Sequence, residues 1–200
     1  MICVRKVCVY AYTIGLFICA QSAEAFAKDG EGTKPVRPEM GSVATSAVSD
    51  QFPWSETRKL SWDDFRGAAR PAADEFAAVT HCGIGFKLNA AVPGATPQVA
   101  VYNKFYANQS WVRNDAKIPS ILEHEQGHFD LCEIYTRKLR EQMSDVDINT
   151  PNVKNVLMTI YSAINSAYER RQQAYEQETA HGTNINQQKK WVKMMAAELM

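Results

Sequence analysis

The chain has 200 residues, of which 46% are hydrophobic and 22% charged, enough for one sizeable hydrophobic core. Its 22 Lys and Arg residues balance 22 Asp and Glu residues, so the formal net charge is zero. A neutral chain lacks the long-range positive field that gathers nucleic acid or an anionic bilayer. These figures exclude nucleic acid as the expected main partner and favour a single main domain.

Residues 1–25 have the layout of a secretory signal peptide. A short basic stretch precedes an apolar run over residues 7–20, and a small-x-small cleavage site follows at Ala23 and Ala25. The alternative, a membrane anchor, is weaker because the run of about 14 residues is shorter than the roughly 20 that span a bilayer. We therefore expect signal cleavage, no stable membrane insertion afterwards, and a secreted or periplasmic protein.

Signal cleavage would leave Cys82 and Cys132 as the only cysteines of the mature chain. Two thiols in an oxidising compartment predict one disulfide. The alternative is a pair of buried free thiols, which is a common state for cysteine.

A flexible leader is predicted over residues 26–51, which are rich in small, polar and charged residues and poor in large apolar ones. The folded domain is expected to cover residues 52–200. Near its start, Ser61 is predicted to cap a short helix that ends before Gly67.

Two β-strands are predicted next, over residues 76–88 and 98–106. The first is rich in β-branched and aromatic residues, and the second alternates two sets of side chains. Pro93 and Gly94 between them are typical of a turn. The pair is expected to form a hairpin or the edge of a small antiparallel sheet.

Three helices are predicted after the strands. Apolar residues recur at helical spacing from Pro119 to Met143, and again from Thr150 to about Ala180. A last amphipathic segment covers residues 186–200. The predicted fold class is α+β, with a small antiparallel sheet packed on two long helices and a C-terminal helix.

The first long helix contains an H-E-x-x-H motif made by His124, Glu125 and His128. Residues four apart lie on one helix face, so both imidazoles can bind the same Zn²⁺ ion. Glu125 is placed to act as general base on an activated water. The alternative is a pair of surface or hydrogen-bonded core histidines without metal.

A catalytic zinc site needs a third protein ligand, and the end of the second long helix offers candidates. Tyr175, Glu178 and His181 are three residues apart and are expected to share a face. We expect His181 to be the ligand because imidazole suits zinc and because Gly182 lets the chain turn. Glu178 is the second candidate and Glu176 the third. The alternative for His181 is that it caps the C-terminus of the helix. Tyr175 is expected to donate a hydrogen bond that stabilises an oxyanion.

Three stretches together resemble a known family: residues 122–131, residues 60–67, and the segment from Tyr175 to Gly182 with Gln188 and Trp191. They are similar to a bacterial domain-of-unknown-function family numbered nine-two-two, over roughly residues 52–195. Members are described as secreted zinc-dependent proteases, so the resemblance implies a zincin-like metal site. Where the family tends to have Asp after the tyrosine, this chain has Glu176, which keeps the carboxylate.

The predicted function is an exported zinc-dependent hydrolase, a metallopeptidase of the H-E-x-x-H type. Its expected substrate is a peptide or protein, with cell-wall peptide as one option. One alternative is a non-catalytic exported module in which zinc is structural or buffered, and a fourth protein ligand would favour it. Another is a helical adaptor without metal. The sequence predicts neither the physiological substrate nor the oligomeric state.

Overall fold

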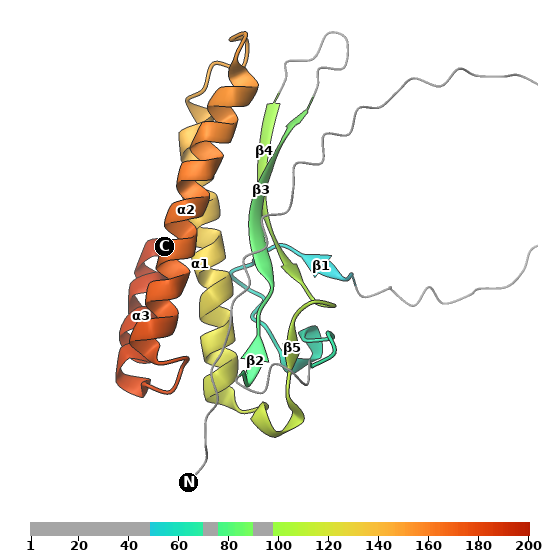
Figure 1. Cartoon of the computed structure of the whole chain (residues 1–200), viewed down its shortest axis with the longest axis vertical. Coiled ribbons are helices and arrows are strands. Elements are labelled where there is room, and N and C mark those ends of the chain that lie inside the picture. The colour runs from blue at the N-terminus through green and yellow to red at the C-terminus, as the bar shows by residue number, and fades with distance from the viewer. Residues whose placement is uncertain (1–48, 70–75, 90–97) are drawn as a thin grey trace, which may run out of the picture. The chain divides into compact units, whose positions relative to one another are not determined.

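The computed structural model describes residues 49–69, 76–89 and 98–200 (Figure 1). The predicted signal peptide, nearly all of the predicted leader and the predicted turn at Pro93 and Gly94 lie outside the described residues. None of the helices in the described ranges is long and apolar enough to cross a membrane.

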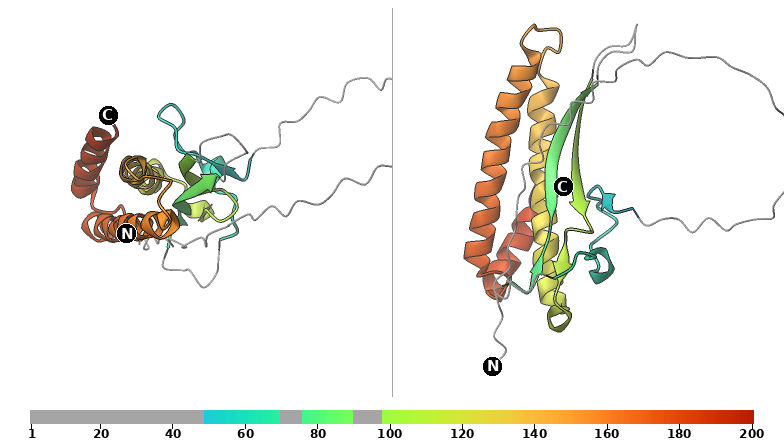
Figure 2. Two further views of the ribbon diagram at one scale, coloured as in Figure 1. Left: turned by 90° about the horizontal axis from the view of Figure 1, so that it is seen from above. Right: turned by 45° about the vertical axis from the view of Figure 1, so that its right-hand side comes forward.

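The helices are α1 (Pro119–Ser144), α2 (Val153–Thr179) and α3 (Ile185–Leu199). Their ends confirm the predicted helices to within a few residues. Helix α2 begins later than predicted, because the preceding residues form a turn in which the Val153 N–H donates to the Thr150 carbonyl at 3.1 Å. Helix α1 contacts both other helices and strands β3 (Cys82–Asn89) and β4 (Gln98–Tyr106), so it is the central element (Figures 1 and 2).

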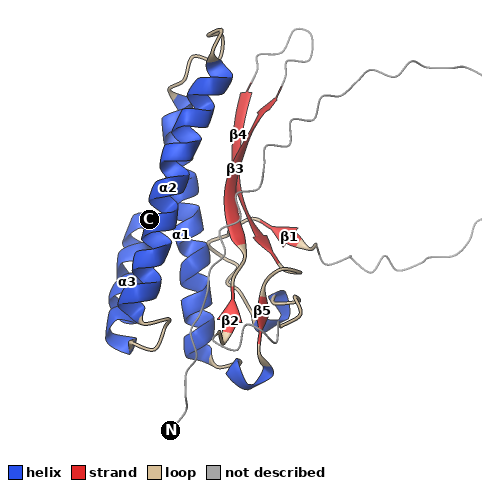
Figure 3. Ribbon diagram, in the orientation of Figure 1, coloured by secondary structure: helices blue, strands red, loops and turns tan. Residues whose placement is uncertain are grey.

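The larger sheet has three antiparallel strands in the order β1 (Gln51–Phe52), β4 (Gln98–Tyr106) and β3 (Cys82–Asn89). It faces the helices in a separate layer (Figure 3). A two-stranded sheet pairs β2 (Ala78–Val79) with β5 (Trp111–Val112). The small antiparallel sheet on two long helices and a C-terminal helix confirms the predicted α+β class.

The predicted strand over residues 76–88 is wrong in one respect, because it is two strands in two sheets. Thr80 and His81 separate β2 from β3. The Thr80 side chain is fully buried, and its hydroxyl donates to the main-chain oxygen of Glu125 at 3.4 Å. The break therefore brings the chain against the helix turn that carries the H-E-x-x-H motif.

Two short 3₁₀ helices complete the described elements, at Trp62–Asp64 and Asn114–Ala116. The first follows Ser61, as predicted. The Ser61 N–H donates to Asp64 Oδ2 at 2.8 Å, so an acid in the first turn satisfies a main-chain donor that the short helix leaves open.

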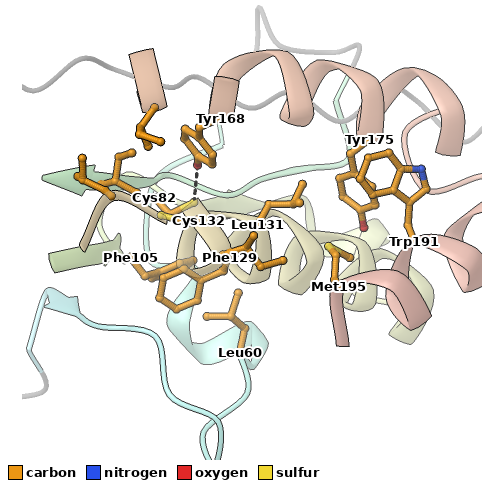
Figure 4. Close-up of a cluster of buried hydrophobic side chains, with 14 of the residues drawn as sticks. Leu60, Cys82, Phe105, Phe129, Leu131, Cys132, Tyr168, Tyr175, Trp191 and Met195 are labelled. Carbon is orange, nitrogen blue, oxygen red and sulfur yellow. Dashed lines mark hydrogen bonds between the residues drawn. The ribbon is translucent and has the colours of Figure 1, made fainter. Parts of the chain in front are cut away.

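The hydrophobic core lies along α1, between the sheet and the other helices. Figure 4 shows Phe105 of β4 against Phe129 of α1, with ring centroids 5.5 Å apart, and Tyr168 of α2 approaching from the other side. Leu131 of α1, drawn beside them, is fully buried. Because α1 is enclosed on both sides, the side chains of its motif turn are held in place.

Cys82 and Cys132 are both buried in this core, and both are free thiols. The predicted disulfide is therefore not formed in the structure. Cys82 Sγ lies 3.4 Å from the Tyr168 hydroxyl (Figure 4) and 3.7 Å from the carbonyl oxygen of His128. Burial, together with a hydrogen bond to Cys82, raises the pKa of Cys132 well above its usual value. The thiols thus have hydrogen-bond partners without a bridge.

Candidate metal centre

Helix α1 places His124 and His128 on one face, as the four-residue spacing predicts. Both side chains are fully buried. Their Nε2 atoms are 3.1 Å apart, and the ring planes are nearly perpendicular. The two imidazoles therefore converge on one point inside the protein.

Glu176 of α2 supplies a carboxylate at the same point. Its Oε2 lies 3.4 Å from His124 Nε2, and its Oε1 lies 3.3 Å from His128 Nε2. One ligand atom from each of the three residues lies within 4.8 Å of the others, so in the described part of the chain this group could hold a metal ion. We call these three residues the donor triad.

The two residues that the sequence favoured as third ligand lie elsewhere. His181 contacts the triad from outside, with Nδ1 2.8 Å from Glu176 Oε2. Glu178 Oε2 accepts a hydrogen bond from Trp191 Nε1 at 2.9 Å. Glu176, which the sequence ranked third, is the residue that the structure brings to the two imidazoles.

The stripe of α2 that faces α1 explains this placement. It runs from Leu157 and Ile164 through Tyr168 to Gln172 and Glu176, all of them buried. The last three are spaced four apart, so Glu176 continues the apolar stripe that was visible in the sequence. Extending that stripe by two turns is the signal that could have identified Glu176; the three-residue spacing from Tyr175 leads to the neighbouring face.

Two glutamines fix the orientation of the imidazoles. The Gln188 Nε2 donates to the Tyr175 hydroxyl at 2.7 Å, which leaves its Oε1 to accept from His124 Nδ1 at 3.1 Å. The Gln172 Nε2 donates to the main-chain oxygen of His128 at 3.0 Å, and its Oε1 accepts from His128 Nδ1 at 2.6 Å. Each Nδ1 therefore carries a hydrogen, as in most metal-binding histidines. No role was predicted for Gln172 from the sequence.

This tautomer leaves a bare lone pair on both Nε2 atoms when the imidazoles are neutral. The two lone pairs and the Glu176 carboxylate then face one another without a hydrogen between them. Burial opposes ionisation of Glu176, but protonated His128 and His124 beside it would hold its pKa well below the usual range. Either a proton or a metal cation thus satisfies this centre, and two imidazoles with a carboxylate fit zinc.

Glu125 lies next to His124 and is fully buried. Neither of its carboxylate oxygens has a partner at ordinary hydrogen-bond distance and angle within the described residues, although the Thr80 hydroxyl and main chain lie close enough to lower its pKa. Burial raises the pKa of Glu125 to about 7, although the charge of His124 acts in the opposite direction. A buried carboxyl group without partners is costly to maintain, so its presence points to a ligand or water that the protein has to accommodate.

Tyr175 supports both imidazoles. Its ring stacks on His124 with centroids 4.6 Å apart and meets His128 edge-on at 4.9 Å. Its hydroxyl donates to the main-chain oxygen of His124 at 3.1 Å. The predicted role as an oxyanion donor would require the hydroxyl to leave this partner.

Gly127 permits the close approach of Tyr175, as its place inside a helix suggested. A Cβ on Gly127 would overlap the Tyr175 hydroxyl and lie 3.1 Å from a methyl group of Met195. Helices α2 and α3 can therefore reach the motif turn only because residue 127 has no side chain.

Gln126, the remaining residue of the motif, faces away from the triad. Its Oε1 accepts from the Leu60 N–H at 2.7 Å, and its Nε2 donates to Asp130 at 2.8 Å. Asp130 also accepts from Trp54 Nε1 at 2.6 Å. This face of the turn anchors the segment before the first 3₁₀ helix and has no access to the centre.

Residues 95–182 match a family described as "Bacterial protein of unknown function (DUF922)". No curated protein and no solved structure matches the chain. The matched range contains β4, α1, α2 and the whole donor triad. The part of the chain that carries the candidate metal centre therefore matches the family that the sequence motifs resemble.

Proposed function

We propose that this protein is an exported zinc-dependent hydrolase that cleaves peptide bonds. The observation that carries the proposal is the Glu125 carboxyl group, one position from a triad ligand, which is fully buried and has no hydrogen-bond partner of ordinary geometry among the described residues. A proton-transfer group needs to be free to exchange its proton, and a pKa of about 7 favours that exchange near neutral pH.

The donor triad supports zinc as the metal. Two imidazole nitrogens and one carboxylate oxygen are the protein ligands of one known class of catalytic zinc sites. Bound zinc supplies a Lewis acid that polarises a carbonyl group and lowers the pKa of water. Gln172 and Gln188 hold the imidazoles in the tautomer that such binding requires.

Glu125 is assigned the proton transfer. Its carboxylate takes a proton from the attacking water and later gives it to the leaving amine. Thr80, which donates to the Glu125 main-chain oxygen, and the enclosing helix keep the side chain in its place. Tyr175 and the two glutamines orient ligands and do not touch the reacting atoms in this assignment.

A non-catalytic zinc module is the second candidate, and the complete burial of His124 and His128 favours it. In that case zinc would only hold α1 and α2 together. Such a site gains nothing from an unpartnered carboxyl group at Glu125, because a fourth ligand or an apolar residue would serve better. We therefore prefer the hydrolase.

The proposals of export and of a peptide or protein substrate are supported by the sequence alone. The signal-peptide pattern over residues 1–25 supports a secreted or periplasmic protein, and the balanced charge argues against nucleic acid as partner. The H-E-x-x-H motif supports peptide or protein substrates, with cell-wall peptide among them.

Glu125→Gln tests the mechanism, with Glu123→Gln as the matched control because Glu123 is exposed on the same helix turn. Both zinc-loaded variants are assayed with fluorescent casein and with cell-wall peptide. Glu125→Gln should bind about one zinc per chain and lose activity by about a hundredfold or more, whereas Glu123→Gln should match the wild type. Full zinc binding with no activity in the wild type would favour the non-catalytic module.

A further inference from the structure

The turn after α2 has an unusual backbone. Ala180, His181 and Gly182 follow one another with φ angles of 47°, 56° and 78°, all in the left-handed region. Residues other than glycine seldom adopt this conformation, and where they do the surrounding structure has to enforce it. Here the His181 N–H donates to the Glu176 carbonyl at 2.9 Å, and the Gly182 N–H donates to the Thr179 hydroxyl at 3.3 Å.

The turn packs directly on two members of the donor triad. A Cβ on Gly182 would lie 2.9 Å from the His124 ring, so the main chain there touches one ligand. His181 touches another, with Nδ1 2.8 Å from Glu176 Oε2. The left-handed turn thus directs the His181 ring onto the carboxylate.

The two oxygens of Glu176 consequently differ. Oε2 has a hydrogen bond to His181, whereas Oε1 is buried and has no hydrogen-bond partner among the described residues. Oε1 lies 3.3 Å from His128 Nε2, and Oε2, which contacts His181, lies 3.4 Å from His124 Nε2. A buried acceptor without a donor is the atom most in need of a cation.

We propose that His181 is a positioning residue, which holds Glu176 through Oε2 so that Oε1 alone is presented to a metal ion between the imidazoles. This inference rests on the metal binding in the proposed function. One oxygen and two imidazole nitrogens make three protein donor atoms, the number found in zinc sites that keep a position open. If both oxygens were available, Glu176 would supply two donor atoms and the site would approach a closed one.

The contacts of His181 also argue against two other roles, that of a metal ligand and that of a simple helix cap. A ligand would have to bring a ring nitrogen to the centre between the imidazoles, but Nδ1 contacts Glu176 Oε2 and His181 is not part of the group that could hold a metal ion in the described chain. A simple helix cap would need only the main-chain bonds of the turn and no contact with a triad side chain.

The test compares His181→Asn with His181→Gly. Asparagine tolerates a left-handed backbone and keeps an N–H donor close to the position of Nδ1, whereas glycine keeps the backbone and removes the donor. Zinc affinity is measured by competition with a chelator, and Co²⁺ absorption reports the number of donor atoms. The unfolding midpoint of the metal-free variants checks that the turn is intact.

We expect His181→Gly to weaken zinc binding by about 10- to 100-fold and to change the Co²⁺ spectrum towards higher coordination. His181→Asn should stay within about threefold of the wild type and keep its spectrum. Wild-type affinity and spectrum in His181→Gly would overturn the positioning role and leave the metal site standing. A loss well beyond 100-fold in both variants would show that His181 is itself a ligand, and a wild type that binds no metal would overturn the proposed function as well.

Discussion

Two buried clusters lie next to each other along α1, and they differ in how their polar atoms are satisfied. In the thiol cluster, Cys82, Cys132 and Tyr168 partner one another. In the centre around the donor triad, by contrast, three carboxylate oxygens of Glu125 and Glu176 have no hydrogen-bond partner of ordinary geometry in the described part of the chain. Both clusters are sealed by the same helices, so burial alone does not explain the difference.

The difference in hydrogen bonding between the two clusters indicates which of them would bind a ligand. Native proteins pair nearly all their buried polar atoms, and each exception calls for an explanation. The thiol cluster needs none and contributes to packing. The triad centre has acceptors that a cation could satisfy, so we expect its residues to control metal binding and the thiol cluster to control stability alone.

The largest expected effect is that of His128→Ala, which removes one triad ligand. Zinc affinity should fall by more than the 10- to 100-fold typical of a supporting residue. Zinc content after purification in zinc-replete, chelator-free buffer, compared with about one ion per wild-type chain, is the measurement. Full zinc content in the variant would contradict the expectation that the triad residues, unlike the thiol cluster, control metal binding.

Gly127→Ala should have the next largest effect, because the added methyl group would displace Tyr175 from both imidazoles. We expect a loss of about 1–3 kcal/mol in the free energy of unfolding, as for other overpacked sites, together with weaker zinc binding. Chemical denaturation with and without zinc measures both. A matched change at Gly83, whose Cβ would have only an ordinary contact at 3.9 Å with Tyr106, tests whether the effect is local.

Gln172→Leu should weaken zinc binding by about 10- to 100-fold, since it removes the acceptor that fixes the His128 tautomer. Gln172→Glu keeps an acceptor at this position and serves as the matched variant. Isothermal titration with zinc distinguishes them. Equal affinities of the leucine variant and the wild type would mean that packing alone orients the imidazole.

The sequence predicted one half of the triad centre much better than the other. On α1 the His124 and His128 pair is visible because the motif is short and chemically distinctive. On α2 the corresponding turn, Gln172 and Glu176, has an ordinary composition, and only its continuation of the buried stripe marks it. Which helix face turns inward depends on packing against α1, and a preference for imidazole over carboxylate pointed to His181 instead.

The fold, like the triad centre, was predicted from the sequence only in part. The helices have strong periodicity and clear ends, and the 98–106 strand was predicted with its bounds. The switch between two sheets at Thr80 and His81 left no pattern in the sequence, because both sides of the break are equally rich in strand-forming residues. That switch positions Thr80 beside the motif turn. The break between β2 and β3, which was not predicted, therefore affects the candidate metal centre.

The smallest effect on metal binding is expected for Cys132→Ala. The side chain is fully buried, so losing it should lower the free energy of unfolding by about 1–2 kcal/mol. Zinc affinity should stay unchanged, since the side chain of Cys132 interacts with Cys82 and Tyr168, which are not triad residues. Thiol titration of the denatured wild type after signal cleavage adds a second readout, because free Cys82 and Cys132 give two reactive thiols. A loss of zinc binding in this variant would show that the clusters are coupled through α1, while two missing thiols in the exported protein would restore the disulfide that the sequence predicted.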